Sequence, residues 1–169
     1  DLGLFNYWAD TLREFGPWGF YANASYADYT PGYLYALWPI GYLRDFASGM
    51  GVAQDVVDSL IKLPAVLADF GIAAVVGYAL RARPGWAIAG ALAVLLSPAV
   101  WYVSAWWAQF ESLYVLPMLA GWALVTRGRP GWAAVAIAIG LMTKPQALPL
   151  AIPFVAYYLR RFGLGESVR

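Results

Sequence analysis

The feature that most constrains this sequence is a series of long apolar segments that begins at residue 59 and runs almost to the carboxyl terminus. At 1.5 Å per residue, residues 59–80 make a helix of roughly 33 Å, enough to cross the hydrocarbon core of a bilayer. Apolar residues are 62% of the chain and charged residues 12%. Soluble domains have about half apolar and a quarter charged residues. The sequence therefore predicts an integral membrane protein.

Five apolar segments are expected to cross the membrane as helices. They are residues 59–80, 85–104, 111–126, 131–143 and 147–159. The segments after the first, third and fifth crossing contain seven of the eleven basic residues and a single acid, Glu166. By the positive-inside tendency, these arginine-rich segments are expected on the cytoplasmic side.

Residues 1–58 are expected to form an extracytoplasmic loop with two helices lying on the membrane. Residues 2–15 place Leu4, Phe5, Trp8, Leu12 and Phe15 on one helical stripe. Residues 31–46 begin with a favourable Pro31, but their apolar run of about 13 residues is shorter than the roughly 20 that a crossing needs. The predicted fold class is an all-α polytopic membrane protein, with these interfacial helices followed by a transmembrane bundle over residues 59–169.

The residue inventory excludes several kinds of chemistry. The chain has no cysteine and no histidine, so disulfides, thiol chemistry, imidazole metal sites and Ser-His nucleophiles are ruled out. We expect no metal and no cofactor. The net charge of +1 gives no reason to expect a nucleic-acid partner. Because the chain starts at Asp1 rather than methionine, it is expected to be a piece of a longer protein.

A short arginine motif occurs twice. Arg81-Ala-Arg-Pro-Gly-Trp-Ala87 recurs as Arg127-Gly-Arg-Pro-Gly-Trp-Ala133. The repeat can arise by convergence, because arginine is common in cytoplasmic turns, proline in the first helical turn and tryptophan at the membrane interface. The alternative is a duplicated helical hairpin.

Polar residues gather on the predicted extracytoplasmic side. Lys144 lies between the last two apolar segments beside Pro145, and unwound backbone at membrane depth is normally tolerated only inside protein or along a wet cavity. Gln109 and Glu111 are expected on the same side, which favours a functional Lys144 over a lysine that only snorkels to the surface.

Two carboxylates receive structural interpretations. Asp69 lies about midway along the first span, where a charge is costly, so it is expected to bond another helix or to be protonated. Asp58 is expected to cap the amino terminus of that span.

Five short motifs follow one another along the chain. They are Asp1 with Trp8, Ala27-Asp28-Tyr29-Thr30-Pro31-Gly32-Tyr33, the segment 62–69, Trp107-Ala-Gln109-Phe-Glu111-Ser, and Thr143-Lys144-Pro-Gln146. In this order they resemble the GT-C superfamily of membrane glycosyltransferases. The most similar branch is that of the glucosyltransferases which extend the lipid-linked oligosaccharide of asparagine-linked glycosylation, with their prokaryotic relatives.

The resemblance implies an inverting hexosyltransferase that moves a sugar from a polyprenyl-phosphate donor to a lipid-linked or other extracytoplasmic acceptor. It implies a location among the lipids of a prokaryotic plasma membrane, with the active site facing outward. Asp1 matches the family's catalytic aspartate, which takes a proton from the acceptor hydroxyl. The implied substrate-binding residues are Asp28, Tyr29, Gln109, Glu111, Lys144 and Gln146.

The chain departs from the family pattern in three respects. Thr30 replaces the first proline of the family's Asp-Tyr-Pro-Pro, and Ala108 replaces the His or Gly before the family's Gln. The family's first transmembrane helix and carboxyl-terminal half are absent, so a complete active site is not expected in this chain alone. Two other functions stay open: a membrane carrier with a broken helix at Lys144-Pro145, and a non-catalytic membrane subunit.

Overall fold

The structure, a computed structural model, describes residues 2–163, and that part of the chain contains helices and no strand. The α-helices are α1 (Leu2–Asn23), α2 (Pro31–Gly49), α3 (Gln54–Ser59), α4 (Leu63–Ala79), α5 (Pro84–Leu95), α6 (Pro98–Trp101), α7 (Glu111–Thr126), α8 (Pro130–Thr143) and α9 (Leu148–Phe162). Two 3₁₀ turns (Leu60–Lys62 and Pro145–Ala147) and a π-helix (Tyr102–Trp106) join some of them. The predicted all-α class is confirmed.

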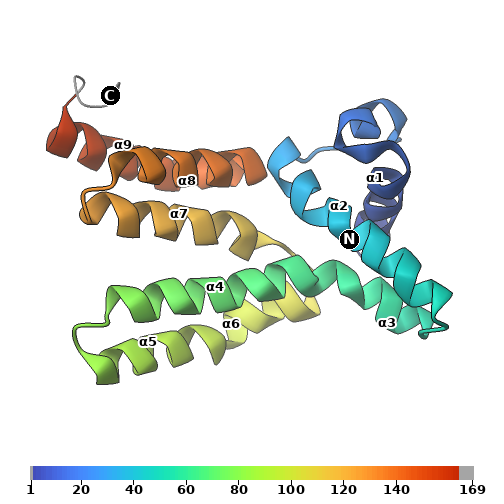
Figure 1. The fold of residues 1–169 in the computed structure, drawn as a ribbon, viewed down its shortest axis with the longest axis horizontal. Coiled ribbons are helices and arrows are strands. Elements are labelled where there is room, and N and C mark those ends of the chain that lie inside the picture. Colours follow the sequence, from blue (N-terminus) through green and yellow to red (C-terminus); the bar gives the residue numbers. More distant parts are fainter. Residues whose placement is uncertain (1, 164–169) are drawn as a thin grey trace.

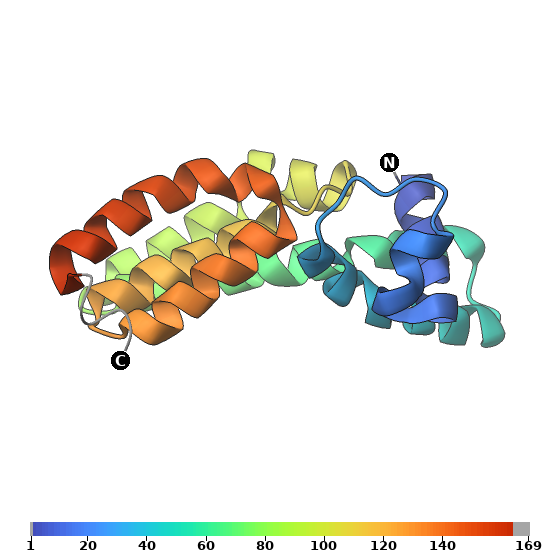
Figure 2. The same ribbon diagram turned by 90° about the horizontal axis from the view of Figure 1, so that it is seen from above.

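The helices form an elongated bundle with a smaller helical unit at one end. In Figure 1, α4, α5, α7, α8 and α9 lie side by side, and α1, α2 and α3 group at the end opposite the α4–α5 turn. Within the bundle, α4 packs against α5 and α7, while α7 packs against α8. Figure 2 shows α9 running along α7 and α8, which it also contacts.

Within residues 2–163, two continuous helical stretches are long and apolar enough to cross a membrane, judged by length and composition. They are Gln54–Ala79 with 26 residues and Pro84–Trp106 with 23. Helices α7, α8 and α9 have 16, 14 and 15 residues, fewer than the roughly 20 of a full crossing. The structure therefore does not support five full-length crossings.

One predicted helix start and one predicted helix end were wrong. The first long stretch begins at Gln54, so Asp58 lies inside a helix and does not cap one. Helix α1 continues past residue 15 to Asn23 across a kink at Gly16, whose φ of 66° lies in the left-handed region. Gly16 and Pro17 are residues that usually end a helix. After the kink, however, Pro17 and Phe20 are buried, and this burial favours a second helical segment.

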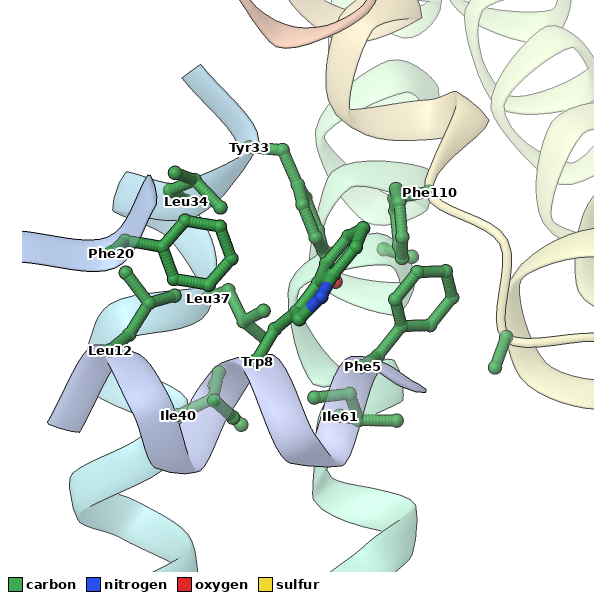
Figure 3. Packing of buried hydrophobic residues seen from close by; sticks show 13 residues of the cluster. Phe5, Trp8, Leu12, Phe20, Tyr33, Leu34, Leu37, Ile40, Ile61 and Phe110 are labelled. Carbon is green, nitrogen blue, oxygen red and sulfur yellow. The ribbon is translucent and has the colours of Figure 1, made fainter. Parts of the chain in front are cut away.

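The core of the smaller unit is aromatic. Of the stripe predicted on residues 2–15, Phe5, Trp8 and Leu12 are at most 2% exposed and pack against α2 (Figure 3). Phe15, the last residue of that stripe, is 45% exposed and does not belong to this core. The ring of Tyr33 from α2 stacks on that of Phe110, with centroids 3.7 Å apart. Because Phe110 directly precedes α7, this stack fastens the smaller unit to the bundle.

Arg44 ties three helices together. Its side chain is buried, and its guanidinium donates to Asp10 Oδ1 of α1 at 2.6 Å and to Asp58 Oδ1 of α3 at 3.1 Å. The same group donates to the carbonyl oxygen of Asn6 at 3.1 Å. A buried cation needs such partners, so the Asp58 carboxylate, predicted as a cap, instead compensates Arg44.

The junction between α2 and α8 depends on a glycine. A Cβ atom at Gly32 would lie 2.5 Å from the Met142 carbonyl oxygen and 2.7 Å from the Thr143 nitrogen. Gly32→Ala is therefore expected to push the two helix ends apart and to destabilise the protein by about 1–3 kcal/mol. Thermal unfolding in detergent measures this, with Gly49→Ala in the same helix as control because its added methyl group meets nothing within 4 Å. Equal melting temperatures for both variants would contradict the close approach.

Candidate functional site

The candidate site centres on Lys144, at the break between α8 and α9. Its backbone is extended, with φ −155° and ψ 127°, and its side chain is buried. The Nζ atom donates to Oε1 and Oε2 of Glu111 at 2.9 and 2.7 Å. It also lies 5.4 Å from the centroid of the Tyr29 ring. Three segments that are distant in the sequence therefore meet at one positive charge.

The two partners of this ion pair differ in exposure. The Lys144 side chain is 9% exposed, whereas that of Glu111 is 38% exposed. Burial by itself would lower the pKa of Lys144, but the hydrogen bonds and charge of Glu111 outweigh it and raise the pKa above its usual value. Lys144 is therefore protonated at neutral pH. Its contribution to stability is complete below the usual lysine pKa and is lost only as the pH rises through the raised value.

A small polar cavity opens beside Lys144. It has a volume of about 180 Å³ and is lined by Asp28, Tyr29, Lys144, Pro145 and Gln146. The proline ends regular helix after α8, and the 3₁₀ turn that follows places Gln146 on the cavity wall. The cavity therefore combines a carboxylate, a phenol, an ammonium group and an amide within reach of one small polar ligand.

Helix α1 holds the loop that carries Asp28 and Tyr29. The indole nitrogen of Trp8 donates to the Tyr26 carbonyl at 2.8 Å, and the Tyr21 hydroxyl donates to the Tyr29 carbonyl at 2.8 Å. The Tyr26 hydroxyl donates to Asp28 Oδ2 at 3.0 Å. These bonds position the loop before α2, and Trp8, which the motif comparison groups with Asp1, belongs to the buried core.

A second, apolar cavity has Glu111 in its wall. Its volume is about 310 Å³, and its walls are Asp69, Glu111 and Ser112 with six aliphatic side chains from α4 to α7. Asp69 accepts hydrogen bonds from Ser104 and Ser112, which confirms that it bonds other helical segments. Glu111 therefore borders an apolar cavity while its carboxylate holds the lysine of a polar one.

The structure brings most of the predicted site residues together. Asp28, Tyr29, Lys144 and Gln146 line one cavity, and Glu111 binds Lys144. Gln109 does not line that cavity; it follows Ala108, whose φ of 60° marks a sharp turn before α7. Asp1, the predicted catalytic base, lies outside the described residues.

Two contributors to the site were not predicted. Phe110 stacks on Tyr33 and thereby positions the neighbouring Glu111; its place inside the Gln109–Glu111 motif was the available signal. Ser104 reaches Asp69 from the π-helix, and a hydroxyl at the end of an apolar segment is too common a feature to predict this.

Within residues 2–163, no three acidic side chains gather where they could hold a metal ion.

Comparisons with known proteins do not assign the chain to a family. The chain matches no protein-family model, no curated protein and no solved structure. The resemblance to the GT-C superfamily therefore remains a prediction from the five motifs.

Proposed function

We propose that this chain is part of an inverting membrane glycosyltransferase that transfers a hexose from a polyprenyl-phosphate donor to a lipid-linked or other extracytoplasmic acceptor. The observation that carries the proposal is the meeting of a polar and an apolar cavity at the Lys144–Glu111 pair. A substrate with a charged phosphate and a long hydrocarbon chain needs both kinds of surface at one place.

The helix surfaces support a membrane location. Helix α5 buries no side chain, and large apolar residues such as Leu92, Leu96 and Trp101 are about half exposed or more. Soluble proteins rarely expose such continuous apolar surface. In this proposal α7, α8 and α9 cross the membrane beside the two longer stretches, giving five crossings despite their short lengths.

The charge distribution supports an orientation. The turns after α4 and α7 and the end of α9 lie at one end of the bundle, and they carry six arginines of the described chain (Figure 1). The candidate site and the α1–α2 unit lie at the opposite end. By the positive-inside tendency the arginine end is cytoplasmic, so the site faces outward in a prokaryotic plasma membrane, with α1 and α2 lying on its surface.

The proposed chemistry divides between three groups. A sugar hydroxyl is a weak nucleophile, and a carboxylate that accepts its proton speeds the attack on the anomeric carbon; Asp1 has this role. The departing polyprenyl phosphate takes the bonding electrons and gains negative charge. Lys144 offers that phosphate a compact cation, and Asp28, Tyr29 and Gln146 offer hydrogen bonds to the sugar.

The direct test is a transfer assay. The intact protein, purified in detergent, is incubated with radiolabelled polyprenyl-phosphate glucose and with a membrane lipid extract as the source of acceptor. We expect the label to move to the extract with inversion at the anomeric carbon. Retention of configuration, or no transfer from polyprenyl-phosphate glucose, mannose or galactose, would contradict the proposal.

The broken helix at Lys144-Pro145 supports a second candidate, a membrane carrier, because interrupted helices bind substrates in many transporters. Uptake of a solute into protein-containing liposomes, driven by a proton or sodium gradient and absent from empty liposomes, would favour the carrier. The large outer unit favours the transferase, because a carrier has no need of it.

A further inference from the structure

The repeated arginine motif brings four arginines to one end of the bundle. Arg81 and Arg83 lie in the turn between α4 and α5, and Arg127 and Arg129 lie in the turn between α7 and α8. Both turns lie at the end of the bundle that is remote from the candidate site (Figure 1). Since α4 packs against α7, the two copies are neighbours in space.

Tyr78 holds two of these charges together. The guanidinium carbons of Arg81 and Arg127 each lie 4.3 Å from the centroid of its ring. Arg81 donates to the Tyr78 carbonyl at 3.0 Å, and Arg127 donates to the Ala123 carbonyl at 2.8 Å. Among residues 2–163, none of the four arginines of the motif forms an ion pair with a carboxylate. This positive charge is concentrated and is not compensated by the described part of the chain.

A groove between α4 and α7 begins at these arginines. Its volume is about 660 Å³, and its lining combines Tyr78, Arg127 and Arg129 with four aliphatic side chains, among them Val75 and Ala120. The groove is therefore cationic and aromatic at the turns and apolar between the helices. Arg129 also lines a second hollow together with Trp132, a residue that is 66% exposed.

We propose that this groove binds an anionic phospholipid, with the lipid phosphate on Arg127 and Arg129 and the start of an acyl chain against Val75 and Ala120. Planar guanidinium groups bind phosphate oxygens in pairs, and basic pockets between transmembrane helices are suited to anionic headgroups. The aliphatic lining favours a lipid over free phosphate, which would gain nothing from it. The inference rests on the membrane location proposed above and does not require the transferase activity.

The test uses the intact protein in detergent and native mass spectrometry. The probes are dioleoyl phosphatidylglycerol, dioleoyl phosphatidylcholine and inorganic phosphate, and the variants are Arg129→Gln and Arg127→Gln with Arg129→Gln. The control is Arg160→Gln with Arg161→Gln, which removes two charges from the end of α9, outside the groove. Arg127 donates side-chain hydrogen bonds to Ala123 and Tyr78, whereas Arg129 makes none among the described residues. The Arg129→Gln variant therefore keeps the turn folded and tests the proposal even if the double variant does not fold.

We expect the protein to retain phosphatidylglycerol in preference to phosphatidylcholine. Phosphatidylglycerol binding should be about fivefold weaker in Arg129→Gln, weaker again in the double variant, and unchanged in the α9 control. Ala120→Trp, which fills the apolar part, should weaken phosphatidylglycerol binding while all four arginines remain. The proposal would be overturned if the α9 control lost as much phosphatidylglycerol binding as the groove variants, or if the protein retained both lipids equally. Binding of inorganic phosphate as tight as that of phosphatidylglycerol would also overturn it. Sugar transfer measured on the same variants should not change, so this site and the transferase proposal can fail separately.

Discussion

Asp1→Asn in the intact protein is expected to lower kcat for sugar transfer by a factor of about 10² to 10⁴ and to leave donor binding nearly unchanged. A positioned carboxylate that accepts the acceptor's proton contributes about that factor to the rate, and asparagine keeps the shape while losing the basicity. The assignment of Asp1 rests on its match to the aspartate of the GT-C pattern.

Single-turnover transfer from a radiolabelled donor, with donor binding measured separately, separates the chemical step from binding. The control is Glu14→Gln, which removes one exposed carboxylate from α1. If Asp1→Asn retained more than about a tenth of the activity, Asp1 would not be the general base. A loss of both donor binding and folded protein would give Asp1 a structural role.

Lys144→Met is expected to lower kcat/KM for a polyprenyl-phosphate sugar by about 10- to 150-fold, the value of one charge-assisted hydrogen bond. Methionine has nearly the same length as lysine and no charge. Lys62→Met, at the chain's other lysine, is the control and should change kcat/KM little. An unchanged kcat/KM in Lys144→Met would reduce Lys144 to a structural partner of Glu111.

Glu111→Gln separates these two roles of Lys144. Both carboxylate oxygens of Glu111 accept from Nζ, so a donor phosphate must compete with Glu111 for the lysine. If Lys144 binds the donor, Glu111→Gln should lower the donor's Kd, because an amide is a weaker competitor than a carboxylate. If the pair is only structural, the same variant should lower the melting temperature and leave donor binding unchanged.

Local features of the sequence determined most of the helix boundaries. Helices α2, α5 and α8 begin at Pro31, Pro84 and Pro130, where a proline in the first turn has no hydrogen bond to lose. The predicted segment 111–126 coincides with α7. Such boundaries depend on residues within one or two turns, and apolar periodicity likewise predicted that Phe5, Trp8 and Leu12 share a buried face.

Only the tertiary structure decided which polar side chains meet. Lys144 and Glu111 are 33 residues apart, and Arg44 and Asp10 are 34 apart. Whether such groups touch depends on how each helix is rotated about its axis, and one residue of shift turns a side chain by about 100°. The helical segment after the kink at Gly16 could not be predicted from local sequence either. It depends on the burial of Pro17 and Phe20, which only the packing of the folded chain provides. The sequence by itself therefore specified helices and their apolar faces, while packing between distant helices selected the ion pairs and cavities of the site.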